Sequence, residues 1–213
     1  MRKTHGPPVH ALTTSDLETW KPVMWRLNDP ADRVPIDTEF SKNADRSEIW
    51  YYGTRAGALG DPAKHREPHA IYSATIDSSR LVDPMLRIRG MGLADPAPLT
   101  VSGETWLFVT TQPGRAIGLA KGSPLQVVRE WNGVSVPHAM LVGEAIWLWA
   151  QRVERGMMVP VRSISLDRGQ TWSDWSTPFA VKDISGCGNP VGAIFQGDPV
   201  VFCVTEPLGV PVQ

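Results

Sequence analysis

The sequence is short of cysteine. Its 213 residues include only Cys187 and Cys203, too few for a secreted disulfide framework and without the Cys-x-x-Cys spacing of zinc or redox sites. Cys187 stands in a glycine-rich turn and Cys203 in an apolar run, so we expect two free thiols rather than a disulfide. We accordingly expect no metal site and no cofactor.

Long apolar runs and an excess of charge of one sign are also missing. No segment approaches the about 18 apolar residues that span a bilayer, and the first residues lack the apolar core of a secretion signal. Lys and Arg total 21 against 22 for Asp and Glu, so the net charge is −1 and no basic block marks a nucleic-acid site. We expect a protein of the cytoplasm, or one released by a non-classical route, with neither nucleic acid nor membrane as partner.

Glycine, proline and tryptophan are plentiful instead, with 19, 19 and 9 residues. Frequent Gly and Pro disfavour long helices, while a hydrophobic content of 42% is enough to bury a core. The composition favours an all-β chain.

A repeated pattern runs through the chain: a residue before proline, a short apolar strand, a turn and an aromatic-rich strand. Four segment pairs show it, at 34–40 with 49–55, 95–101 with 105–111, 136–142 with 146–152, and 189–195 with 199–205. In the last three units, ten residues separate the proline from the matching position of the second strand. In the first unit, counted from Pro35, the spacing is 15, and we attribute the difference to a polar insert at 41–47. Each unit is predicted to be a β-hairpin.

Two further candidate strands accompany each hairpin. They lie at 69–75 and 85–89, 115–120 and 125–129, 159–165 and 177–181, and, for the last unit, at 8–14 and 21–25 near the N-terminus. Four units of four antiparallel strands, with the N-terminal strands completing the last sheet, predict a small β-propeller closed through its termini. The predicted single domain spans 1–213, with blades near 31–90, 93–131, 134–182, and 187–213 plus 7–27. A five-bladed or incomplete propeller and a β-sandwich are the alternatives.

The segment Ser-Leu-Asp-Arg-Gly-Gln-Thr-Trp at 165–172 falls between the third and fourth strands of the third unit. It resembles the Asp box, or BNR motif, of sialidases and related β-propellers. Asp167 can accept turn N–H groups, Gly169 can adopt a positive φ, and Trp172 can pack against the blade. Ser165 and Thr171 complete the motif, and a shortened version of it joins the two N-terminal strands. We interpret these residues as structural, because fold motifs of this kind do not carry catalysis.

In a propeller the first strand of each blade begins near the axis, and the loops between second and third strands open on the same face. This places two candidate catalytic carboxylates, Asp37 and Asp95, near the centre. The candidate ligand-binding residues are His138, Asn189, Arg55, Arg152 and Glu206. Such a mixture of carboxylate, imidazole, amide and guanidinium groups suits a polyhydroxylated ligand.

The first-strand positions also resemble those of arabinanase- and fructosidase-like glycoside hydrolases. That family places acids as Asp-Pro in early blades and as Glu-x-Pro in the third. Asp95 and Pro96 fit the pattern, Asp37 stands two residues after Pro35, and Ser135 replaces the third-blade Glu. The resemblance implies a glycosidase-like propeller that binds a glycan without an intact catalytic triad. An active glycoside hydrolase with atypical carboxylates, and a structural or interaction module of a larger assembly, remain the alternatives. An oligomer is compatible with each of them.

Overall fold

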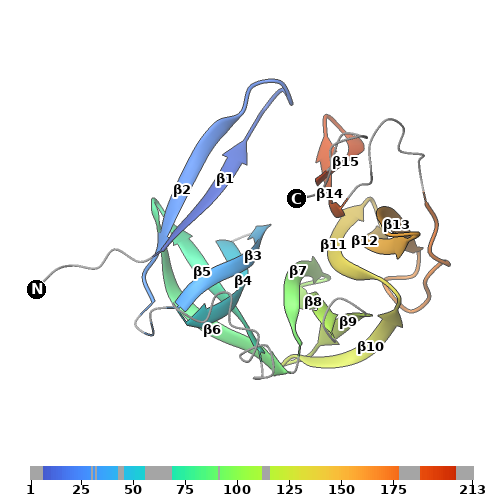
Figure 1. The fold of residues 1–213 in the computed structure, drawn as a ribbon, viewed down its shortest axis with the longest axis horizontal. Helices are drawn as coiled ribbons and strands as arrows, with labels where there is room; N and C mark the ends of the chain where they lie inside the picture. The colour runs from blue at the N-terminus through green and yellow to red at the C-terminus, as the bar shows by residue number, and fades with distance from the viewer. Residues whose placement is uncertain are drawn as a thin grey trace, which may run out of the picture. The chain divides into compact units, whose positions relative to one another are not determined.

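The structure is a computed structural model. It describes residues 7–29, 31, 33–42, 46–55, 69–90, 92–111, 116–177 and 188–204. Within these ranges the chain is built of β-strands, and it divides into two compact units, Met1–Pro96 and Ala97–Gln213 (Figure 1). The described part contains no helix with the length and apolarity that crossing a membrane requires.

The first unit holds a six-stranded sheet. Its strands are β1 (Pro8–Thr13), β2 (Lys21–Leu27), β3 (Arg33–Lys42), β4 (Ser47–Arg55), β5 (His69–Asp77) and β6 (Arg80–Gly90), in the spatial order β1-β2-β6-β5-β4-β3. Strands β3 to β6 form the antiparallel series that the sequence predicts for the first repeat. This series appears as one sheet in Figure 1.

The N-terminal hairpin β1–β2 joins this sheet through a short parallel contact between β2 and β6. Arg26 pairs with Arg80 and Leu27 with Leu81. Leu27, Leu81 and Val9 are buried in the apolar core of the unit, so the hairpin shares that core. The sequence did not predict this contact. The predicted pairing of the N-terminal strands with the last sheet would join the two units and stays a prediction.

The second unit holds three sheets. A four-stranded sheet contains β7 (Ala94–Val101), whose first residues belong to the first unit, β8 (Glu104–Thr111), β9 (Ala116–Lys121) and β10 (Gln126–Asn132). A three-stranded sheet contains β11 (Ser135–Val142), β12 (Ala145–Glu154) and β13 (Met157–Ser165), and a two-stranded sheet contains β14 (Gly188–Phe195) and β15 (Asp198–Val204). The fourth strand predicted from residue 177 lies outside the described residues, apart from Thr177. We call β3, β7, β11 and β14 the first strands, and each lies at an edge of its sheet.

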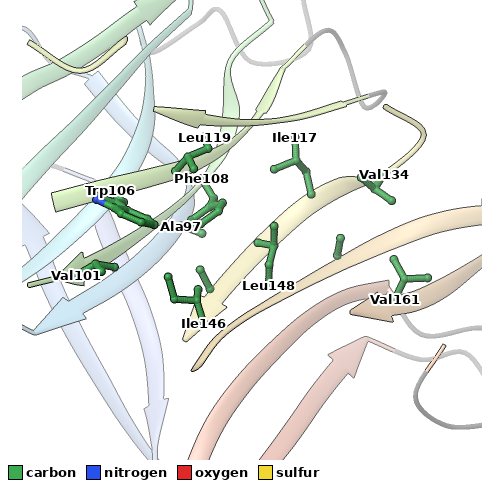
Figure 2. Close-up of a cluster of buried hydrophobic side chains, with 12 residues drawn as sticks. Ala97, Val101, Trp106, Phe108, Ile117, Leu119, Val134, Ile146, Leu148 and Val161 are labelled. Carbon is green, nitrogen blue, oxygen red and sulfur yellow. The ribbon is translucent and has the colours of Figure 1, made fainter. Parts of the chain in front are cut away.

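The core of the second unit lies between two neighbouring sheets. Trp106 and Phe108 of β8 face Ile146 and Leu148 of β12, and all four are nearly inaccessible to solvent (Figure 2). Residues two apart on a strand point to the same face, which explains the spacing in both strands. Because β8 is buried from 106 to 111, its other face is covered too, as expected for sheets stacked as blades.

The turn after β13 is held by side-chain hydrogen bonds. The Oγ of Ser165 donates to Asp167 at 2.8 Å and accepts the N–H of Gly169 at 2.7 Å, while the N–H of Thr171 donates to Asp167 at 2.8 Å. The bonds from Thr171 lower the pKa of Asp167 to about 2. Trp172 donates from Nε1 to the carbonyl of Gly169 and packs against the aromatic rings of the preceding sheet. This turn therefore joins its own sheet to the neighbouring core.

The turn between β1 and β2 is held by a similar set of side-chain hydrogen bonds. The Oγ1 of Thr14 accepts the N–H of Leu17 at 2.9 Å, and Asp16 accepts the N–H groups of Glu18 and Thr19 at 2.9 and 2.7 Å. Leu17 has a φ of 64°, and Arg168 in the later turn has a φ of 57°. The backbone bonds lower the pKa of Asp16 to about 2. The two turns thus share a hydroxyl, a carboxylate two residues later and a left-handed residue directly after it.

The expectation of two free thiols is wrong. Cys203 on β15 is disulfide-bonded. The sequence holds one other cysteine, Cys187, which lies outside the described residues. Disulfides persist mainly in oxidising compartments, so this bond gives no support to the predicted cytoplasmic location.

Candidate functional site

Each first strand carries one residue in the left-handed backbone region. These residues are Asp37, Asp95, Val136 and Asn189, with φ between 48° and 53°. At three of them the pairing with the second strand shifts register, as in a β-bulge. A positive φ is uncommon for residues other than glycine, above all for a β-branched valine. The same local distortion therefore recurs at the same place in every sheet, and bulges of this kind re-aim side chains.

This recurrence corrects the alignment of the first repeat. Counted from the left-handed residue, the first unit has the same spacing as the others, since Glu39 pairs with Trp50, His138 with Trp149 and Val191 with Phe202, eleven residues apart each time. The predicted insert at 41–47 is therefore wrong. Beyond its bulge, the β3–β4 hairpin has one residue pair fewer than the β11–β12 hairpin. The connection between its two strands is longer by two residues. An alignment based on proline fails in the first unit because Asp37 is followed by Thr38, whereas the other three left-handed residues precede proline.

The corrected alignment makes Asp37 and Asp95 equivalent. Asp37 is thus not displaced by two positions, as the sequence suggested, but occupies on β3 the place that Asp95 occupies on β7. Asp37 remains exposed to solvent and Asp95 is half-buried. The structure brings these two predicted carboxylates together in the first unit, close enough for one charge to act on the other.

The pKa of Asp37 is raised from 3.8 to about 6. Partial burial of the carboxyl is the main cause, and the charge of Asp95 is the second. A carboxyl that is accessible yet partly desolvated can bind a ligand and can exchange a proton near neutral pH. Asp37 therefore combines accessibility with the protonation behaviour of a functional group.

A stability measurement tests this environment. The folded protein disfavours ionised Asp37, so the stability that the protonated group contributes is full below pH 3.8 and is lost as the pH rises to about 6. Asp37→Asn is therefore expected to have the higher melting temperature at pH 7, by about 2 °C because solvent screens an exposed group, and no advantage at pH 3.5. Calorimetry at both pH values measures the difference.

Asp83→Asn is the matched control. Asp83 is also exposed and has a φ of 52°, but it lies on β6, which is not a first strand. Its substitution measures what the change from Asp to Asn does at an exposed left-handed position of another strand. An Asp37→Asn variant whose melting temperature gains no more at pH 7 than at pH 3.5 would contradict the raised pKa.

A histidine and a tyrosine that contact each other also belong to the first unit. The rings of Tyr52 and His69 are in tilted contact, with centroids 4.7 Å apart and planes inclined by 32°. The Nδ1 of His69 lies 3.1 Å from the carbonyl oxygen of Leu93, two residues before Asp95. No role was predicted for His69 from the sequence. Its position, directly after the long loop between the second and third strands, was the only available signal.

The remaining candidates are distributed differently. His138 pairs with Trp149 beside the bulge of β11, and Asn189 is the exposed left-handed residue of β14, so both belong to the second unit. The Nε of Arg152 donates to Glu154 on the same strand at 2.7 Å. Arg55 is the last residue of β4, and Glu206 lies outside the described residues. A single funnel that gathers all of these residues stays a prediction.

Sequence reasoning missed two side chains that support the bulges. The Oγ1 of Thr110 accepts the N–H of Val136 at 3.0 Å, and the Oε1 of Gln151 accepts the N–H of Asn189 at 3.0 Å. Both side chains come from the second strand of the preceding sheet. They satisfy backbone donors that the irregular pairing at a bulge leaves open.

The fold is similar to those of several solved glycoside hydrolases. An exo-1,5-α-L-arabinanase from a bovine ruminal metagenomic library is 12% identical, with a TM-score of 0.62 over 96% of this chain and 83% of that one. The α-L-arabinanase of Cellvibrio cellulosa is 11% identical, with a TM-score of 0.59 over 95% and 87%. The exo-β-1,3-galactanase of Phanerochaete chrysosporium is 9% identical, with a TM-score of 0.55 over 94% of this chain.

The chain therefore shares the all-β propeller fold of these structures. The chain spans little more than half, 56%, of the galactanase's length. No family model matches the sequence, and comparison with curated proteins gives no match.

Proposed function

We propose that the chain binds an oligosaccharide through the end of the first unit that carries Asp37 and Asp95. The observation that carries this proposal is the pairing of the two carboxyls. They stand at equivalent left-handed positions of two first strands, and the charge of one acts on the proton affinity of the other. Distortions of this kind turn a side chain toward a site, and they interrupt the regular strand pairing.

The chemistry of the pair fits the hydroxyl groups of a sugar. Ionised Asp95 would accept hydrogen bonds, and charge-assisted bonds of this type are stronger than neutral ones. Asp37, with its pKa near 6, would both donate and accept in mildly acidic solution. The half-buried rings of Tyr52 and His69, with centroids 4.7 Å apart, belong to the same unit. A net charge of −1 gives no preference for a highly charged ligand.

The ligands of similar structures support the class of compound. The Cellvibrio cellulosa arabinanase has been solved with arabinohexaose and the Phanerochaete chrysosporium galactanase with β-1,3-galactotriose. These two sugars are therefore sensible first probes. The Asp-box resemblance of the turn at 165–172 supports a wider relation to sialidase propellers, which we also propose.

Glycoside hydrolysis is the second candidate, and the raised pKa of Asp37 favours it. A glycosidase needs one protonated acid and one ionised carboxylate across the scissile bond, and Asp37 with Asp95 offers that combination near pH 6. The third first-strand position carries Ser135 and Val136 in place of an acid. We therefore expect binding without efficient turnover.

Titration calorimetry with arabinohexaose and with galactotriose tests the proposal. A heat of binding to either sugar supports it, provided that the heat disappears when the protein is first saturated with that sugar. The same samples assayed for new reducing ends separate binding from hydrolysis, since a sustained increase would establish the enzyme. If neither these sugars nor a wider panel of neutral oligosaccharides bind, the carbohydrate proposal fails. The alternative of a structural or interaction module is then favoured.

A further inference from the structure

In the second unit, a polar side chain on a second strand holds the left-handed residue of the next first strand. Thr110 holds Val136, and Gln151 holds Asn189, each through a 3.0 Å hydrogen bond to the backbone N–H. The two side chains occupy one position in the repeat. Thr110 comes fifteen residues after Asp95, and Gln151 comes fifteen residues after Val136. The position is therefore one that secures the following bulge.

Tyr52 occupies the same position in the first sheet, fifteen residues after Asp37. The left-handed residue of the next first strand, β7, is Asp95. A phenol ring thus stands where the other sheets have a hydroxyl or an amide close to the backbone. The ring packs instead on His69, with centroids 4.7 Å apart. Since a carbonyl oxygen can only accept, the Nδ1 of His69 carries the hydrogen and donates it to Leu93.

This hydrogen bond acts on the connection that leads into β7. The chain passes through Gly92, with a φ of 67°, and the side chain of Leu93 is buried with 4% exposed. The His69 bond fixes the carbonyl of Leu93, and burial fixes its side chain. Two residues later the backbone enters the left-handed conformation at Asp95. Because the carbonyl and the side chain of Leu93 are both held, the backbone at Asp95 can rotate less.

We propose that Tyr52 and His69 form a positioning pair that sets the place of the Asp95 carboxyl relative to Asp37. The inference deepens the proposed function and rests on it for the role of the two acids. His69 acts here through the backbone of Leu93 and needs no contact with a ligand, so it is a positioning residue.

The proton affinity of Asp37 reports the separation of the carboxyls, because Asp95 is the charged group that raises it. The experiment is an NMR titration of the Asp37 side-chain carbonyl in the full chain. His69→Phe keeps an aromatic ring at this position but removes the hydrogen bond, and we expect the pKa of Asp37 to fall from about 6 toward 3.8. His69→Gln restores a donor and should restore the value. Thr110→Val removes the corresponding support of Val136 and should leave the pKa of Asp37 unchanged.

An unchanged pKa of Asp37 in folded His69→Phe would overturn the proposal, as would an equal fall in Thr110→Val. If His69→Phe does not fold, Tyr52→Leu provides the second test, since it removes the ring beneath His69 and should lower the same pKa. The titration uses no sugar. If the proposed function is wrong, the wild type will bind no sugar, and the titration is unaffected. If the positioning role is wrong, the titration alone will show it.

Discussion

Gly169→Ala is expected to lower the stability of the protein by about 2–4 kcal/mol, which corresponds to about 5–12 °C in melting temperature for a chain of this size. Two costs add up at this position. Gly169 has a φ of 81°, where a Cβ costs about 1 kcal/mol. The new Cβ would also lie 2.5 Å from the ring of Trp106, which is 5% exposed and has Lys121 against its face. Thermal unfolding followed by near-ultraviolet circular dichroism measures the loss.

Gly103→Ala separates the two costs. Gly103 also has a φ of 81°, but a Cβ there would have no atom within 4 Å beyond the adjacent residues. Its substitution should therefore cost only the backbone term, about 1 kcal/mol. Equal losses in the two variants would mean that the Trp106 ring moves aside freely, and the junction between the two sheets would then not depend on close contact at Gly169.

The hairpins could be predicted because their signals are local. Alternating apolar residues, turn residues and a fixed spacing place β7 and β8 within one residue of the predicted bounds, and β14 and β15 likewise. Burial on both faces of β8 follows from the same apolar run. Such features depend on neighbours in the sequence, and the structure confirms the all-β propeller fold that they imply.

The bulges could not be predicted from the same signals. Proline disfavours helical conformations in the residue before it and usually leaves that residue extended. Asp95, Val136 and Asn189 all precede proline and are nevertheless left-handed. The one available hint is that Asp and Asn tolerate this conformation better than most residues. Sequence spacing from proline therefore aligned the last three units correctly and misplaced Asp37 in the first.

The pair of Tyr52 and His69 depends on contacts between strands. Seventeen residues separate them along the chain, and the sequence between Arg55 and His69 carries no periodic signal. Antiparallel pairing of β4 with β5 is what brings the two rings together. The disulfide at Cys203 escaped prediction for a related reason, since two cysteines alone do not specify their geometry.

Asp95→Asn is expected to weaken oligosaccharide binding by about 10–100-fold. The substitution keeps the shape of the side chain and tolerates the left-handed backbone, but it removes the charge that strengthens hydrogen bonds to sugar hydroxyls, about 1.5–3 kcal/mol. Titration calorimetry with arabinohexaose or galactotriose, whichever the wild type binds, measures the change. Asp83→Asn, at an exposed left-handed position on β6, should bind as the wild type does.

The same variant predicts a second, independent change. Removing the Asp95 charge leaves the burial of Asp37 in place, and burial is the larger cause of its raised pKa. The pKa of Asp37 should therefore fall only part of the way from about 6 toward 3.8. Weaker binding together with this partial fall would show that the two carboxyls act in one site. Unchanged binding would remove Asp95 from the site, whatever the titration of Asp37 gives.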